Sequence, residues 1–400
     1  MPAFSCPRVI VATLLWGATL PVFADVTGEP AEGCRVVAPQ SALTSAPQGD
    51  LSAFPPPQLE IRTPMAPSAV PSGGRNYLIY ELHLRNFSDG GMELQGLEVV
   101  AAGADPSGSL AAFQGDELAS LLSVYGSDVP TSADAGVQLP PGGSAIAFLC
   151  LAFEGRRRLP TQLSHRVHLD GLVADSPTID VVRKPLRVLA PPVAGADWTA
   201  AGGPSNTSHH RRGPIVVDGV FRISRRFALD WKQLIDGTSF EGNALDVRAY
   251  HAYGRNVLAV ADARVVSVMD DVPDNVPRTA AGFSPAVRLT MENIAGNHVI
   301  LDVGEGQFAY YAHLQPGSVS VQVGDRVRSG QVLGRIGNSG DAREPHLHFQ
   351  LTDAPDILAA EGLPHVIDRY RLRVGAESYE RTNELPVRGT LIDFQPASPH

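Results

Sequence analysis

Short stretches of alternating apolar and polar residues recur along this 400-residue chain. Such alternation is typical of half-buried β-strands, whose side chains point to opposite faces in turn. Before residue 190 these stretches are Leu59–Arg62, Asn76–Asn86, Leu94–Val100, Ser144–Phe153 and His165–Leu169. Clusters of Gly, Pro, Asn or Asp separate several of them, so we predict an antiparallel β-sandwich of immunoglobulin-like type over residues 56–190. A short helix is expected from Ala112 to Tyr125.

A second β-rich region is expected over residues 204–394. Its apolar or alternating runs are Val216–Ile223, Arg226–Trp231, Asn256–Met269, Val287–Met291, Asn297–Val303, Gln307–His313, Gln331–Ile336 and His346–Leu351, with tail elements at Pro364–Tyr370 and Gly389–Phe394. Residues 191–203 are rich in Pro, Ala and Gly and are predicted to be the linker. The chain is therefore expected to be mainly β with two domains, as its length also favours.

The first 24 residues have the pattern of a secretory signal peptide. Arg8 gives a thin positive start, and the apolar run from Val9 to Leu20 is too short to span a membrane comfortably. Val22-Phe23-Ala24 fits the small-x-small cleavage rule. We expect an exported protein, periplasmic or extracellular, with no membrane span. Residues 25–55, rich in Ala, Pro, Ser and Gly, are expected to be a flexible lead-in.

The composition adds three constraints. Hydrophobic residues make up 44% of the chain and charged residues 18%, which is typical of a folded protein. A net charge of −10 gives no sign of a nucleic-acid partner. After removal of the signal peptide, Cys34 and Cys150 remain. They can pair in an oxidising compartment, or Cys150 can be a free buried thiol, and the sequence leaves both open.

Candidate chemistry begins with His346 and His348, two residues apart on an expected strand. Side chains at that spacing project from the same face of a strand. Two neighbouring imidazoles can hold a metal ion and a proton-transfer group, although two surface histidines would give the same pattern. Asp230 shares the polar face of its own alternating run with Arg226. A carboxylate there is a ligand candidate, or it is simply solvated.

Several further motifs occur in order between about residues 205 and 353: Asn256–Val266, Gly296–Asp302, Tyr310–Leu314, Val323–Gly334, and the run from Gly337-Asn338-Ser339-Gly340 to His346-Leu347-His348. Together they resemble the lysostaphin/LytM-type zinc metallopeptidases, which cut peptide cross-links of bacterial cell walls. The resemblance implies an antiparallel β-sheet LytM-type peptidase domain over residues 204–394. It also implies one Zn²⁺ cofactor and a peptidoglycan peptide, or another extended peptide, as substrate.

The same resemblance assigns roles to four residues. Asp230 and His348 would be zinc ligands, and His346 would be the general base. His313 would stabilise the developing oxyanion or assist proton transfer. Catalytic zinc sites use three protein ligands and keep one position for water, so one ligand is still missing from this set.

The missing ligand marks a departure from the family. Its members commonly carry a histidine four residues before the aspartate, where this chain has Arg226. A guanidinium has no free lone pair and cannot replace that ligand. His209 or His210, in a loop upstream, could supply it if a hairpin with the Arg226–Trp231 strand brings the loop beside the site. Otherwise the His-His-Arg-Arg run is a solvated basic loop and the site has lost a ligand.

The leading expectation is a zinc-dependent endopeptidase that cleaves peptidoglycan cross-links by metal-activated water, with His346 as general base. The alternative is a catalytically impaired LytM-type module that binds the cell wall or activates a wall amidase. A third is a peptidase that acts on a non-wall protein. The bond cleaved is not set by the sequence.

Overall fold

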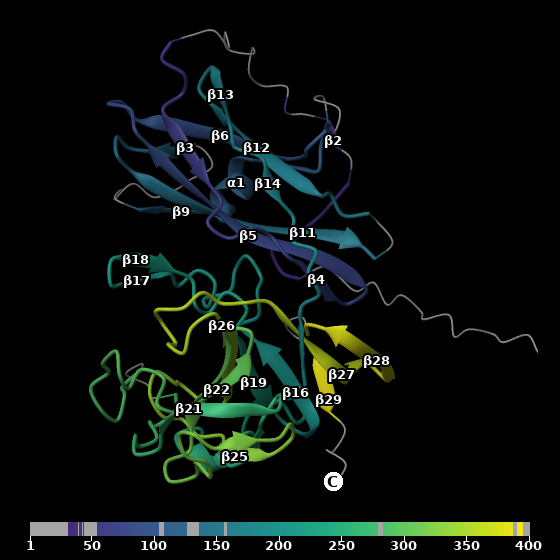
Figure 1. Cartoon of the computed structure of the whole chain (residues 1–400), viewed down its shortest axis with the longest axis vertical. Coiled ribbons are helices and arrows are strands. Elements are labelled where there is room, and N and C mark those ends of the chain that lie inside the picture. Colours follow the sequence, from purple (N-terminus) through teal and green to yellow (C-terminus); the bar gives the residue numbers. More distant parts are fainter. Residues whose placement is uncertain are drawn as a thin grey trace, which may run out of the picture.

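The computed structural model describes residues 31–38, 40–41, 43, 54–103, 108–125, 136–155, 158–278, 283–386 and 390–394. The expected signal peptide, residues 1–24, and most of the expected lead-in lie outside these ranges. The described chain is almost entirely β, as predicted (Figure 1). Its helices are α1 (Gly115–Leu121) and the 3₁₀ turn η2 (Val247–Ala249), and none of the helices in the described ranges has the length and apolar character needed to cross a bilayer.

Two six-stranded sheets form the N-terminal half. The first has the order β1 (Arg35–Val36), β11 (Ser144–Glu154), β5 (Arg75–Asn86), β3 (Leu59–Arg62), with β4 (Ala69–Ser72) on β5 and β9 (Leu122–Tyr125) on β11. The second has the order β10 (Val137–Leu139), β6 (Met92–Ala101), β12 (Gln162–Leu169), β13 (Leu172–Asp175), with β14 (Ile179–Asp180) on β12 and β8 (Ala111–Gln114) on β6. Both contribute to one buried apolar cluster, so they form a sandwich. Its immunoglobulin-like topology stays a prediction.

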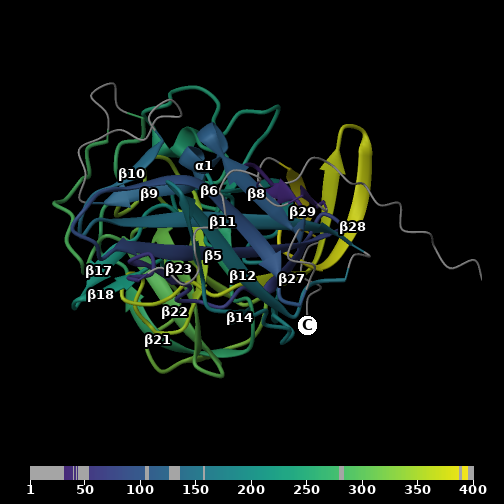
Figure 2. The same ribbon diagram turned by 90° about the horizontal axis from the view of Figure 1, so that it is seen from above.

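An eleven-stranded sheet organises the C-terminal half. Its order is β15 (Arg187–Leu189), β27 (His365–Val374), β29 (Leu391–Phe394), β16 (Gly195–Ala201), β19 (Leu229–Gln233), β26 (Leu347–Thr352), β23 (Gln307–Leu314), β22 (Asn297–Gly304), β21 (Ala263–Met269), β24 (Arg326–Val327), with β28 (Glu377–Glu384) on β27. Leu347, Phe349 and Leu351 of β26 point into its core, as the alternation predicts. Burying each stabilises the fold by about 2 kcal/mol. Figure 2 shows β27 and β28 at one side of the molecule, away from β21 and β22.

Three two-stranded ladders complete the described fold: β17 (Ile215–Val217) with β18 (Val220–Arg222), β2 (Gln40–Ser41) with β7 (Gly108–Ser109), and β20 (Asn256–Leu258) with β25 (Val332–Arg335). The predicted run Asn256–Met269 is thus two strands with separate partners. The expected strand Val287–Met291 was wrong, because its residues are at most half-buried and the Asn293 side chain fixes a turn by accepting from the Thr290 N–H.

Two other expectations differ from the structure in extent. The predicted helix from Ala112 to Tyr125 is confined to α1, because strands β8 and β9 occupy its two ends. The predicted linker, residues 191–203, contains β16, which pairs with β19 and β29. Trp198 and Ala200 of β16 are fully buried, and this burial explains why an Ala/Gly-rich segment forms a strand. The domain boundaries as a whole remain predictions.

The two halves are closely joined. Tyr77, Ile79 and Cys150 of the sandwich belong to the same apolar cluster as the core of the large sheet. Cys34 and Cys150, left open by the sequence, form a disulfide across 116 residues. In Figure 1 the β17–β18 hairpin lies between the sandwich and the large sheet. The residues that follow β16 therefore lie between the sandwich and the large sheet.

Candidate metal centre

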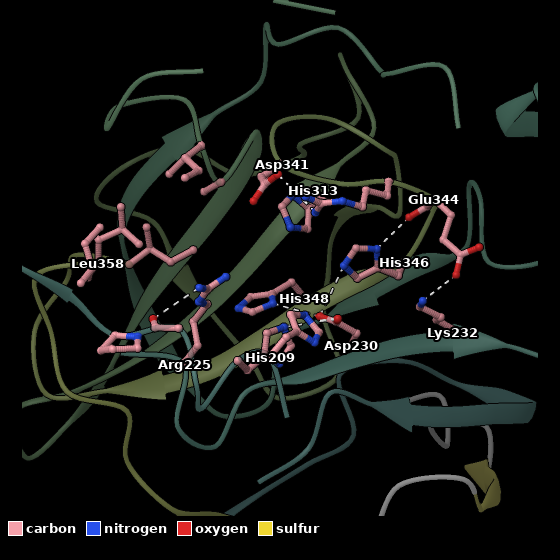
Figure 3. Close-up of a pocket in the computed structure, with 18 of the residues that line it drawn as sticks. His209, Arg225, Asp230, Lys232, His313, Asp341, Glu344, His346, His348 and Leu358 are labelled. Carbon is pink, nitrogen blue, oxygen red and sulfur yellow. Dashed lines mark hydrogen bonds and ion pairs between the residues drawn. The ribbon is translucent and has the colours of Figure 1, made fainter. Parts of the chain in front are cut away.

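Strand register brings the predicted site residues together. Asp230 of β19 lies directly opposite His348 of β26, and His348 lies opposite Ala312 of β23. His313 follows Ala312 with a φ of 64°, a left-handed conformation that non-glycine residues adopt mainly where the surrounding structure imposes it. His346 immediately precedes β26. Four residues from three adjacent strands thus meet at one point of the sheet, and Figure 3 shows their side chains converging.

The carboxylate of Asp230 is the centre of this cluster. It is buried, and three imidazoles contact it. Nδ1 of His348 lies 3.0 Å and Nε2 of His346 lies 3.4 Å from Oδ1, while Nε2 of His210 lies 3.3 Å from Oδ2. His210 therefore belongs to the site, although it is twenty residues upstream of Asp230.

The opposite nitrogen of each ring is already used. Nδ1 of His210 donates to the carbonyl of Gly202 at 3.0 Å, and Nδ1 of His346 donates to that of Glu344 at 2.7 Å. The remaining ring, His348, donates from Nε2 to Oε1 of Gln350 at 2.8 Å, and the amide of Gln350 is oriented by its own donation to a carbonyl. Partners of this kind fix the tautomer of metal-binding histidines.

This arrangement fits a metal ion. In a neutral ring only one nitrogen carries a hydrogen, so the nitrogens that face Asp230 present lone pairs to carboxylate oxygens. Lone pairs that face one another at these distances repel unless a proton or a cation lies between them. Two imidazoles and a carboxylate form a donor set typical of catalytic zinc, with further coordination left for water. Asp230 could hold the ion together with two of the three rings, and the family resemblance predicts His348 as one of them and His346 as the base.

The pKa shifts of these groups also favour the forms that bind a metal ion. Burial opposes ionisation of Asp230, but positive charge on the side of His210 and His346 outweighs it and keeps the pKa of that carboxyl well below its ordinary value. Burial, reinforced by neighbouring rings, lowers the pKa of His348 and lowers that of His313 further. At neutral pH the carboxylate is therefore charged and these two rings are neutral, which is the form in which such groups bind a metal.

His209 and His210 differ in position. Ligand atoms of His209, His210 and Asp230 lie within 4.8 Å of one another, so both histidines are near the centre. His209 is the more exposed of the two, and its ring lies against that of His210 at a tilt of 47°, with centroids 4.2 Å apart. Burial and then His210 lower the pKa of His209 to about 4. His210 alone of the pair has the direct carboxylate contact and the fixed tautomer.

The route that brings His210 to the site is not the predicted hairpin. β18 pairs with β17, whereas β19 pairs with β16 and β26. Ala201, the last residue of β16, lies opposite Asp230, and the loop that carries His210 leaves the sheet one residue later. The loop is also not a solvated basic segment, because Arg211 is fully buried.

Arg226, at the position of the expected ligand, points elsewhere. Its Nε donates to Glu81 of the sandwich at 2.8 Å, and its Nη1 donates to Glu361 at 3.0 Å. Sequence reasoning missed Glu81 and the second partner of His348, Gln350. A signal for Gln350 existed, because it lies two residues after His348 on the same strand face.

His313 borders the same centre without touching Asp230. Its Nδ1 donates to the carbonyl of Ser339 at 2.8 Å, and its ring centroid lies 5.0 Å from that of His346. The centre opens into a cavity of about 500 Å³, lined by polar and apolar side chains. An extended chain can therefore approach the carboxylate–imidazole cluster from outside.

Residues 243–357 match the sequence model of Peptidase family M23. The match includes His313, His346 and His348 and begins after Asp230. Relatives include the cell division protein DipM of Caulobacter vibrioides, 28% identical over 31% of this chain and 16% of that protein, and the peptidoglycan DD-endopeptidase ShyA of Vibrio cholerae, 32% identical over 20% and 18%. The glycyl-glycine endopeptidase ALE-1 of Staphylococcus capitis is 43% identical over 14% and 15%.

The chain thus spans less than a fifth of the length of each of these three relatives. Among solved structures, the catalytic domain of lysostaphin from Staphylococcus simulans is 20% identical and covers 42% of this chain and 88% of its own, with a TM-score of 0.23. That superposition adds nothing to the match of the family model.

Proposed function

We propose that this chain, whose residues 243–357 match the model of Peptidase family M23, is a zinc-dependent endopeptidase that hydrolyses peptide bonds in peptidoglycan cross-links. One observation carries this proposal. Asp230 faces the nitrogens of His210, His346 and His348, and the opposite nitrogen of each ring is held by another acceptor. A bound zinc ion would lower the pKa of a water molecule and polarise the scissile carbonyl.

His346 has the geometry of the general base. Its Nδ1–H is held by the Glu344 carbonyl, so Nε2 carries the lone pair and faces the carboxylate of Asp230. A water molecule bound beside that carboxylate would be within reach of Nε2, which would accept its proton as the water attacks. The backbone contact keeps the ring oriented throughout this transfer.

His313 is better suited to proton transfer than to oxyanion binding. Its Nδ1–H donates to Ser339, so the neutral ring has an acceptor at Nε2 and no hydrogen to offer an oxyanion from that atom. Its ring is next to that of His346. A proton accepted by His346 has a second basic site close by, through which it can reach the leaving amine.

One cation of the cavity supports an acidic substrate, although Asp230, Asp341 and Glu344 line the same cavity. Four cations line it: Arg225, Lys232, Arg278 and Arg343. Glu344 pairs with Lys232 and Arg278, and Asp341 lies 3.4 Å from Arg343. Within the described part of the chain, Arg225 has no carboxylate at ion-pair distance and donates only to the Gly213 carbonyl at 3.5 Å. We expect it to meet a substrate carboxylate, such as those of peptidoglycan stem peptides.

The compartment we propose is outside the cytoplasm, periplasmic or extracellular. The Cys34–Cys150 disulfide supports it, because such bonds persist in oxidising compartments. The impaired-module alternative depended on a lost ligand, and the contact of His210 with Asp230 weighs against that loss.

The direct test is incubation of the full-length protein with purified peptidoglycan, followed by fragment analysis by mass spectrometry. We expect cross-linked muropeptides to be converted to monomers, inhibition by a chelator, and recovery on addition of zinc. Zinc-loaded protein that leaves every cross-link intact would overturn the proposed activity. Cleavage of other extended peptides by that same protein would instead indicate a non-wall substrate.

A further inference from the structure

Two buried arginines connect the candidate metal centre to one glutamate of the sandwich. Glu81 lies in the middle of β5 and is buried. Its Oε1 accepts from Nε of Arg211 at 2.7 Å, and its Oε2 accepts from Nε of Arg226 at 2.8 Å. Arg211 directly follows His210, and Arg226 precedes Asp230 by four residues. One carboxylate thus contacts both segments that carry metal-ligand candidates.

Arg211 is held from several directions. Besides Glu81, its guanidinium donates to Asn206 at 2.6 Å and to the backbone carbonyls of Tyr80 and Leu149 at 2.6 and 2.8 Å. Four of the five N–H groups of an arginine are thereby used. The two carbonyls belong to β5 and β11 of the sandwich, so the backbone next to His210 is fixed to that half of the molecule.

Arg226 extends the same network. Its Nη1 donates to Glu361 at 3.0 Å and also lies 3.4 Å from the Gly362 carbonyl. Glu361 is only partly buried and also lies 3.7 Å from Arg222, so each glutamate of the network has two arginine partners. Such pairing is the condition under which ions are tolerated in a protein interior. Burial opposes ionisation of Glu81, but Arg226 and Arg211 outweigh it and hold its pKa below the ordinary value. Glu81 is therefore charged at neutral pH.

The adjacent side chains point in opposite directions. Arg211 and Arg212 face the sandwich, where the guanidinium of Arg212 donates to the Ser120 carbonyl and lies 4.7 Å from the ring centroid of Phe148. His210 faces Asp230. A shift of the loop toward solvent would break the arginine contacts and move the imidazole away from the carboxylate at the same time.

We propose that Glu81 is a positioning residue of the metal centre, through which the sandwich holds His210 in place by way of Arg211. This role rests on the proposed zinc site. Arg226, which occupies the position of the family's usual ligand, serves as the second anchor of the same carboxylate. The sandwich is then part of the metal site's construction, and its function is more than a tether or a wall-binding module.

The test compares two buried glutamates of the sandwich in the full-length chain. Glu81→Gln removes the charge that holds both arginines. Glu98→Gln is the matched control, because Glu98 is equally buried on β6 but pairs with His168 and Arg166 of the sandwich. Zinc affinity is measured by competition with a chromophoric chelator, and the melting temperature is measured on the metal-free proteins. The visible absorption spectrum of the cobalt-loaded proteins reports the ligand geometry.

We expect Glu81→Gln to bind zinc about tenfold more weakly. This is the lower end of the roughly 10–100-fold effect of groups that contact a metal ligand directly, because Glu81 acts through Arg211. Glu98→Gln should bind as the wild type does, even where its melting temperature falls as far. The cobalt spectrum should change only for Glu81→Gln. If folded Glu81→Gln binds zinc as tightly as the wild type and has the same cobalt spectrum, the positioning role of Glu81 is wrong, but the proposed function is not affected. Failure of the wild type to bind zinc would instead contradict the proposed function.

A milder variant covers the case in which Glu81→Gln does not fold. Asn206→Ala removes one acceptor of Arg211 and one donor to the Gly33 carbonyl, and it leaves the Glu81 pair in place. We expect zinc affinity to fall about threefold to tenfold, because the loop loses one of its attachments. An unchanged zinc affinity in this folded variant would contradict the proposal that the sandwich holds the loop that carries His210.

Discussion

Two buried carboxylates, Glu98 in the sandwich and Asp230 in the large sheet, both contact histidine, yet they have opposite surroundings. Glu98 accepts from the Leu43 N–H at 2.6 Å, and His168 and Arg166 lie 3.2 and 3.4 Å away. The neighbours of Asp230 are imidazoles whose N–H groups already point to other acceptors. A carboxylate that the protein satisfies by itself is structural, whereas one that faces lone pairs requires a cation.

The largest effect should come from removing the two carboxylates in turn. Asp230→Ala should leave the purified protein without zinc and lower kcat/KM by about 10³-fold or more, because the metal no longer has its charged ligand. Glu98→Gln should keep one equivalent of zinc. Metal content after dialysis and peptidoglycan cleavage measure both. Full zinc occupancy in Asp230→Ala would show that Asp230, like Glu98, is not needed to bind the metal.

The next effect separates catalysis from metal binding within the Asp230 cluster. His346→Ala should lower kcat by about 10²–10⁴-fold, as is usual for loss of a general base, while zinc stays bound. The carboxylate keeps its contacts with His210 and His348 in this variant. Activity close to wild type would show that another group takes the proton.

The two adjacent histidines of the loop give a graded comparison. His210→Ala should weaken zinc binding by about 100-fold, because the imidazole directly on Asp230 is lost. His209→Ala should change it by less than about threefold, because that ring contacts His210 and not the carboxylate. Zinc titration of both variants tests this order. Equal affinities of the two variants, or the reverse order, would show that the assignment of His210 as the ligand is wrong.

The smallest effect on zinc binding and activity is expected from histidines away from both carboxylates, whose titration changes stability instead. Burial lowers the pKa of His165 to about 3 and that of His365 to about 4. The unfolded chain therefore binds protons that the folded chain does not, and stability must fall as pH drops below about 6.5. Each histidine should remove about 1.4 kcal/mol per pH unit until its folded pKa is reached.

Urea unfolding of the metal-free protein between pH 7 and pH 4 measures this dependence. His365→Leu should make the free energy of unfolding less dependent on pH in that range. The variant lacks the imidazole that takes up a proton when the wild-type chain unfolds. A variant with the same pH dependence as the wild type would show that other groups control acid stability.

The sequence predicts the part of the site that lies on regular strands. Alternation in a strand reports burial directly, so the face shared by His346 and His348 follows from period-two spacing. The position of His348 opposite Asp230 comes from the pairing of β26 with β19 in the structure. The family resemblance added the catalytic and ligand roles, which remain predictions. His313 belongs to the same group because its strand neighbours that of His348.

The rest depends on pairings between distant residues. Trp198 becomes a strand residue only because Gln233 and Ile392 pair with it, and local composition does not contain that information. Glu81 looks like one polar position of an alternating strand. Tyr80 and Leu82 point to the opposite face, into the sandwich core, but the face of Glu81 is buried as well, because Tyr77 and Ile79 on that face pack against the C-terminal half.

The β17–β18 hairpin lies between His210 and Asp230 in the chain and at the edge of the cavity, where Ile215 lines the wall. Its tip, Asp218-Gly219, is exposed and left-handed at both residues. A ligand motif compressed into five residues tolerates no insertion, whereas a tip of this kind can lengthen while both metal-binding side chains stay where they are. Evolution or design can therefore reshape the entrance for longer or branched substrates independently of the chemistry beneath it.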